Sequence, residues 1–200
     1  MVEALPDWLK IAVGGVACFA LPFFVVWMIW STARNARGIG QGLAGGSGSA
    51  CQALGLTLTE RGPLSGAAAG SWRGCSVRVS WVVGHQQGYD VRNQLTYVSA
   101  QLSPPLQAGL HAVEGGAGGG GIGWPELERV MTLHAADPAR ARAALARGGP
   151  LLWSSLGGPG RLSMDDASVT LELPGVSVEQ AQLEQALERV VRLAEALSGL

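Results

Sequence analysis

Glycine, histidine and cysteine are the residue types of this sequence that could support chemistry, and glycine is the most abundant of them. The segment 115–123 reads GGAGGGGIG, a density of glycine that is found in loops that bind phosphate. Such a loop needs a Lys followed by Ser or Thr after the glycines, but Lys10 is the only lysine of the chain. The segment therefore predicts a flexible loop, and we expect no cofactor.

The histidines and cysteines lack the spacings that metal sites and nucleophiles require. His85, His111 and His134 are isolated, with no H-E-x-x-H motif and no pair of histidines at helical spacing. Cys51 and Cys75 are too far apart for a C-x-x-C motif, and no G-x-S-x-G motif marks a catalytic serine. We therefore expect no metal ion and no catalytic residue.

A site assembled from dispersed polar residues is the alternative to a non-catalytic domain. One predicted strand and the turn after it carry charged, imidazole and phenol side chains within a short stretch of the chain. These residues are Arg78, His85, Tyr89, Asp90 and Arg92. If the fold brings them together, the protein is an enzyme of unrecognised type.

Two tryptophans are candidate contact residues for a partner or for a membrane surface. Trp72 and Trp124 stand beside glycines, and Pro125 follows the second, so contact with a partner is an alternative for these rings. A position in the core is the favoured interpretation for both, and the alternating pattern around Trp81 predicts the core for that residue as well. The net charge of -1 disfavours nucleic acid, which requires a basic surface. We therefore expect a protein partner and no nucleic acid.

The segment 11–30 has no charged side chain and predicts a transmembrane helix. At about 1.5 Å per residue this helix would be about 30 Å long, which matches the hydrocarbon core of a bilayer. A cleaved signal peptide is disfavoured, because the run is too long and the leader 1–7 carries acids but no base. The expected anchor residues are Ile11 at the start of the span and Pro22 within it. Trp8, Trp27 and Trp30 place aromatic rings near its ends.

Basic residues near the ends of this span predict its orientation. Arg34 and Arg37 follow the span, whereas only Lys10 precedes it. Because basic flanks stay on the cytoplasmic side, we expect a single-pass protein of the inner membrane with its carboxyl-terminal domain in the cytoplasm. The lipid bilayer would be its first partner, and Cys51 and Cys75 would remain reduced.

Composition divides the chain into three parts. Residues 1–34 form the anchor, the Gly/Ser-rich segment 35–50 forms a flexible linker, and residues 51–200 form a globular domain. Within the domain, alternation of apolar and polar residues predicts strands, most clearly at 76–83 and 94–102. Because the alternation leaves one face polar, it favours an antiparallel sheet that is covered on one side only.

Turns and helices complete the predicted domain. The glycine-rich segment 66–74 predicts a turn, and Asp165-Asp166 predicts the turn of a later hairpin. Asp137-Pro138 predicts the start of a helix, with Asp as the N-cap. Segment 178–197 predicts an amphipathic helix, on which Glu188 and Arg192 could pair across one turn. The predicted fold class is α+β: an N-terminal transmembrane helix, then a mostly antiparallel sheet with the C-terminal amphipathic helix packed on it.

Three short segments precede the terminal helix: Ala135-Ala136-Asp137-Pro138, Leu162-Ser163-Met164-Asp165-Asp166 and Leu171-Glu172-Leu173-Pro174-Gly175. With the anchor and the linker, they resemble uncharacterised single-pass membrane proteins of GC-rich Gram-negative bacteria that carry a C-terminal α+β domain. The resemblance extends over residues 51–200. No activity is assigned to such proteins, so the resemblance implies no activity here.

The sequence favours a membrane-tethered, non-catalytic domain that binds a protein or a component of the cell envelope. This expectation follows from the missing metal-binding and nucleophile motifs. An enzyme with a dispersed polar site and an accessory subunit of a membrane assembly are the alternatives.

Overall fold

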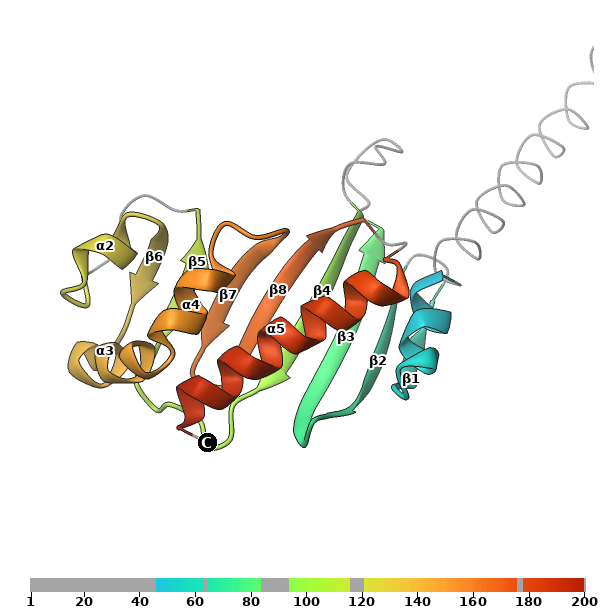
Figure 1. Cartoon of the computed structure of the whole chain (residues 1–200), viewed down its shortest axis with the longest axis horizontal. Helices are drawn as coiled ribbons and strands as arrows, with labels where there is room; N and C mark the ends of the chain where they lie inside the picture. Colours follow the sequence, from blue (N-terminus) through green and yellow to red (C-terminus); the bar gives the residue numbers. More distant parts are fainter. Residues whose placement is uncertain (1–45, 63–64, 84–93, 116–120, 176–177, 200) are drawn as a thin grey trace, which may run out of the picture. The chain divides into compact units, whose positions relative to one another are not determined.

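Antiparallel strands form the sheet on which the described part of the chain is built (Figure 1). The computed structural model describes residues 46–62, 65–83, 94–115, 121–175 and 178–199. In these residues one sheet has the strand order β1-β2-β3-β4-β8-β7-β5-β6. The strands are β1 (Thr57–Arg61), β2 (Ser65–Trp72), β3 (Cys75–Val83), β4 (Gln94–Gln101), β5 (His111–Glu114), β6 (Met131–His134), β7 (Arg161–Asp165) and β8 (Ser168–Pro174).

The longer helices cover one face of this sheet. Figure 1 shows α4 and α5 in front of the strands, and α5 packs on β3, β4 and β8. Helix α3 packs against α4 and α5. The short helix α2 lies against β6. The helices are α2 (Pro125–Glu128), α3 (Pro138–Arg147), α4 (Gly149–Ser155) and α5 (Gln180–Ser198).

The two faces of the sheet differ in polarity because side chains alternate along each strand. Val79, Val98 and Leu171 lie side by side on β3, β4 and β8, face the helices and are buried. The next residues along these strands point the opposite way and are only partly buried or exposed: Arg78, Ser99 and Thr170. The sheet and helices thus form two layers with one core between them, and the other face of the sheet is polar.

The predicted fold class needs one correction. The described residues show an α+β fold with an antiparallel sheet and a terminal helix packed on it, but no helix among them is long and apolar enough to cross a membrane. The statement that a transmembrane helix is part of the fold is therefore wrong for this structure. The segment 11–30 and its anchor residues Trp8, Ile11, Pro22, Trp27 and Trp30 lie outside the described residues.

Strand β2 occupies a segment for which the sequence predicted a turn. Its glycines and alanines have low strand propensity, but small residues are needed here because large side chains lie over the strand. Gly66 is opposite Trp81 in the register of β2 and β3, and a Cβ added to Gly66 would lie 2.3 Å from the Trp81 ring. At Gly70 an added Cβ would lie 2.9 Å from a methyl group of Leu56. Packing against these side chains therefore decides the conformation of β2.

The starts of three helices test the predicted boundaries. Residues 46–53 form a helix that includes the end of the predicted linker, and Ala50 and Cys51 are buried in the core. Helix α3 begins as predicted, because the Asp137 side chain accepts a hydrogen bond from the Arg140 N–H at 3.0 Å. Helix α5 begins at Gln180, two residues later than predicted, and its N-cap Glu179 makes no side-chain capping bond.

Asp166 fixes the connection that carries the chain from β4 to β5, past the end of the β7–β8 hairpin. Its carboxylate accepts hydrogen bonds from the backbone N–H groups of Ala108, Gly109 and Leu110 at 3.1, 2.8 and 2.9 Å. Burial by itself would raise the pKa of Asp166, but these three donors and the charge of Arg140 hold it below its ordinary value. Asp166, in the turn of the β7–β8 hairpin, therefore stabilises the fold.

Candidate functional site

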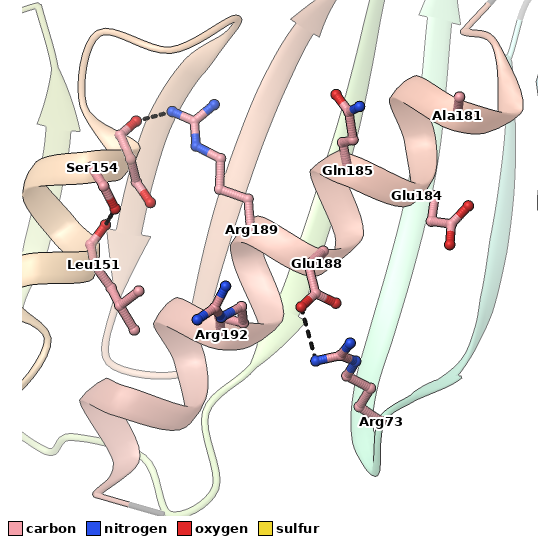
Figure 2. Close-up of a pocket in the computed structure, with 10 residues that line it drawn as sticks. Arg73, Leu151, Ser154, Ala181, Glu184, Gln185, Glu188, Arg189 and Arg192 are labelled. Atoms are coloured by element: carbon pink, nitrogen blue, oxygen red, sulfur yellow. Dashed lines mark hydrogen bonds and ion pairs between the residues drawn. The ribbon is translucent and has the colours of Figure 1, made fainter.

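A groove crosses the exposed side of α5, between α4 and the turn that joins β2 to β3 (Figure 2). Its volume is about 550 Å³. We call it the α5 groove, and the residues that line it are mostly polar: Arg73, Leu151, Ser154, Ser155, Ala181, Glu184, Gln185, Glu188, Arg189 and Arg192. Because these side chains stand on three separate segments, the groove exists only in the folded domain.

An ion pair forms the rim of the α5 groove at the β2–β3 turn. Arg73 Nη1 lies 2.8 Å from Glu188 Oε1, and Figure 2 shows this pair on the side of α5 that faces away from α4. Arg73 has φ +51° and Gly74 has φ +86°, so both residues of the two-residue turn have positive φ, as in a type I′ hairpin. Positive φ is uncommon for Arg. This backbone directs the guanidinium toward α5, and the sequence had predicted Arg192 as the partner of Glu188.

Arg189 forms the opposite rim, next to α4. Its guanidinium donates from Nη2 to the carbonyl of Ser155, at the end of α4, and from Nη1 to the carbonyl of Pro159 at 2.8 Å. Burial lowers the pKa of Arg189, while the charge of Glu114 acts in the opposite direction. A cation at the carboxyl end of a helix is favourable, because it satisfies carbonyl groups that have no partner within the helix.

A second hollow, which we call the β8 crevice, adjoins the groove. Its volume is about 370 Å³, and it lies between the first half of α5, strand β8 and the turn after α4. Leu171, Leu173 and Val178 form an apolar floor and are at most 8% exposed. Its rim consists of Pro159, Gln182 and the two residues that it shares with the α5 groove, Gln185 and Arg189.

The two candidate contact tryptophans lie outside both hollows. Trp72 and Trp124 are half-buried and pack against the core, and the Trp72 Nε1–H is buried without a partner in the described part of the chain. Trp124 stands before α2, where its backbone N–H donates to Glu128 Oε1 at 3.1 Å. Trp153 on α4 is 40% exposed, and no pattern in the sequence distinguishes it from the other tryptophans.

The dispersed polar site cannot be assembled from the residues that the structure describes. Arg78 is exposed on the polar face of the sheet and pairs with Glu60 at 2.8 Å. His85, Tyr89, Asp90 and Arg92, the other members of that predicted set, lie outside the described residues.

The fold brings together two histidines that are isolated in the sequence. His111 of β5 is opposite His134 of β6 on one side and Asp165 of β7 on the other, and all three are exposed. The Asp165 carboxylate accepts hydrogen bonds from the N–H groups of Ala167 and Ser168. Among the described residues no group of three or more His, Cys, Asp or Glu could hold a metal ion.

The cysteines of the domain are free thiols in different environments. Cys51 is fully buried, and burial raises its pKa to about 11. Cys75 is half-buried, and burial together with the charge of Glu195 raises its pKa. A raised pKa keeps the thiol protonated at neutral pH, so neither residue is an activated nucleophile.

Sequence reasoning found the polar side of α5 but missed the site that it forms. Glu188, Arg189 and Arg192 follow from the helical period of that segment. Arg73 comes from a turn within a segment whose strand was not predicted, and the end of α4 that Arg189 binds is fixed only by packing. No local signal in the sequence joins these three segments.

Comparisons with protein-family models, with curated proteins and with solved structures find no match to this chain. The resemblance noted in the sequence therefore stays a prediction. The α5 groove and the β8 crevice are therefore the features from which a function can be proposed.

Proposed function

We propose that this α+β domain is a non-catalytic binding domain that holds a protein partner on the exposed side of α5. The observation that supports this proposal is that two hollows of different chemistry meet at Gln185 and Arg189. One is lined mainly by charged and polar side chains, and the other has an apolar floor. Together they offer the combination of apolar contact and charged rim that protein interfaces use.

The residue types around the α5 groove support a protein partner. Arg73, Arg189 and Arg192 line the groove, and the half-exposed Trp153 lies on α4, which forms one wall. Arginine and tryptophan are enriched among the residues that dominate the binding energy of protein interfaces. Glu184 and Glu188 add negative charge, so the groove would select a partner by the pattern of its charges and not by its net charge.

The contacts of Glu188 and Arg189 favour binding over catalysis. Glu188 is engaged by Arg73, and Arg189 is engaged by two backbone carbonyls. General acid–base catalysis needs a proton donor or acceptor that is free to meet a substrate. Groups held by their own chain are instead suited to shape a rigid surface.

Photo-crosslinking in the source cells tests the proposal. Benzoylphenylalanine replaces Ala181, which lines the groove, or Ala139, which is also an exposed alanine but lies on α3. We expect a discrete protein adduct from position 181 and none from position 139. The partner identified from that adduct should then bind the purified chain.

Two results would contradict the proposal. One is the same set of adducts from both positions, which would indicate random collision. The other is turnover of a small molecule by the purified chain that is lost when Arg192 is replaced by Glu, because this would make the groove an active site.

A further inference from the structure

The β8 crevice contains a cationic group whose donors are only partly used. Arg189 is half-buried, and two of its N–H groups donate to the carbonyls of Ser155 and Pro159. Its Nε–H is buried and has no partner among the described residues. A guanidinium has five N–H donors, so besides the buried Nε–H one N–H on Nη1 and one on Nη2 are not used by these two bonds.

Glu114, whose charge acts on Arg189, is already engaged elsewhere. Its two carboxylate oxygens accept hydrogen bonds from the backbone N–H groups of Gly157 and Leu162 at 2.8 and 2.9 Å. The Nε–H has no accessible surface, so an acceptor in the crevice would have to bind the unused N–H groups of Nη1 and Nη2. A carboxylate is the acceptor that guanidinium groups bind best.

The floor of the crevice requires an apolar group next to this carboxylate. Leu171, Leu173 and Val178 supply the floor, and the volume of about 370 Å³ is within the usual range of ligand pockets. In the last residue of a peptide, an apolar side chain and a carboxylate are attached to the same carbon atom. A C-terminal Leu could thus meet the floor and the guanidinium together.

The rim favours a peptide over a fatty acid. Gln182 and Gln185 are exposed on α5 and line the crevice, and their amides can donate to and accept from a peptide backbone. An acyl chain has no groups for these amides to bind. We propose that the β8 crevice binds the C-terminal residue of the protein partner, with the terminal carboxylate on Arg189 and an apolar side chain on the floor. This inference rests on the proposed function, since it names the part of the protein partner that the crevice binds.

Fluorescence polarisation with the full chain tests this inference. The probe is a fluorescein-labelled peptide, Ser-Gly-Ser-Gly-Leu, with a free carboxylate, and the comparison is the same peptide with an amidated end. We expect amidation to weaken binding by at least about tenfold, as the loss of a charge-assisted hydrogen bond does. Replacing the last Leu by Ser should weaken binding to a similar degree.

Two variants locate the binding without removing Arg189, whose loss could disturb the end of α4. Gln182→Trp places a large ring at the exposed rim of the crevice and should weaken binding by at least about tenfold. Gln180→Trp puts the same ring on the same helix, at an exposed position that does not line the crevice, and should change binding by less than about twofold.

Three results would overturn the inference: equal affinity for the free and amidated peptides, no effect of Gln182→Trp, or binding of decanoate where the peptide does not bind. The last result would identify an acyl carboxylate as the ligand. If the protein cross-linked at Ala181 still binds while the peptide fails, the proposed function stands and only this inference is wrong.

Discussion

Arg73 and Glu188 join the β2–β3 turn to α5 through an ion pair of 2.8 Å. Their side chains are 59% and 31% exposed, and exposed pairs of this kind contribute only about 0–1 kcal/mol to stability. The pair nevertheless fixes the position of one rim of the α5 groove. We therefore assign it a role in shaping the binding surface.

This assignment predicts that stability and binding respond differently when the pair is removed. Arg73→Ala and Glu188→Ala should each lower the free energy of unfolding by less than about 1 kcal/mol. Each should weaken binding of the protein cross-linked at Ala181 by about tenfold, because the rim loses its fixed position. Urea unfolding and calorimetric titration of both single variants and the double variant measure the two effects. A loss of stability as large as the loss of binding energy would show that the pair serves the fold.

Replacement of Asp166 should destabilise the domain at neutral pH. Asp166→Asn weakens three hydrogen bonds to a charged acceptor and should cost about 1–3 kcal/mol. Because the pKa of Asp166 is lowered in the folded state, its contribution is complete above the unfolded value of about 3.9 and is lost as pH falls through the folded value.

The difference in stability between the parent and Asp166→Asn should therefore shrink as pH is lowered from about 7 to about 3. Urea unfolding across this pH range measures it. Glu126→Gln, at an exposed position on α2, is the control and should have little effect at any pH. A difference that stays constant with pH would mean that the charge of Asp166 is not what holds the connection.

A methyl group on Gly66 should collide with Trp81. The added Cβ would lie 2.3 Å from a ring that is only 2% exposed, so Gly66→Ala should cost about 1–3 kcal/mol through overpacking. Gly149→Ala is the matched control, because its Cβ meets no atom within 4 Å in the described part of the chain. The midpoints of urea unfolding compare the stability of the two variants. Equal midpoints would mean that Trp81 does not pack on β2.

The two thiols of the domain should differ in reactivity. Burial raises the pKa of Cys51 to about 11 and removes it from solvent, whereas Cys75 is only half-buried. Iodoacetamide at about pH 8 should modify Cys75 first and Cys51 only when the domain unfolds, because the thiolate is the reactive form. Peptide mass spectrometry measures both rates, with the denatured chain as the reference. Equal rates in the native chain would place Cys51 at the surface.

Much of the fold follows from local patterns in the sequence. The alternation around Val79 predicted β3, and the apolar period of α5 predicted a helix whose Leu187 and Val190 are fully buried. Strand β4 was predicted from Leu95 and Tyr97, but the face that it buries carries Val98 and Ala100 instead. Strand β2 could not be predicted in this way, because glycine and alanine have low strand propensity. Small residues are needed there because the Trp81 ring lies over Gly66. The conformation of that segment depends on a contact with another strand.

The candidate site was less accessible to prediction than the fold. The exposed side of α5 follows from its period, but no pattern in the sequence shows that Arg189 on that side binds the end of α4. Its partners and those of Glu188 come from segments far away in the sequence, and only the packed structure specifies them. Trp72 and Trp124, for which local context left contact with a partner open beside a position in the core, pack against the core.

Two charge reversals test directly whether the α5 groove holds the partner recovered by cross-linking at Ala181. Arg192→Glu reverses an exposed charge in the α5 groove, and Arg142→Glu reverses an exposed charge on α3 that does not line the groove. Calorimetric titration of the full chain should show at least about tenfold weaker binding for Arg192→Glu and less than about twofold for Arg142→Glu. Equal effects of the two reversals would contradict the account, because the partner would then respond to the overall charge of the domain and not to the groove.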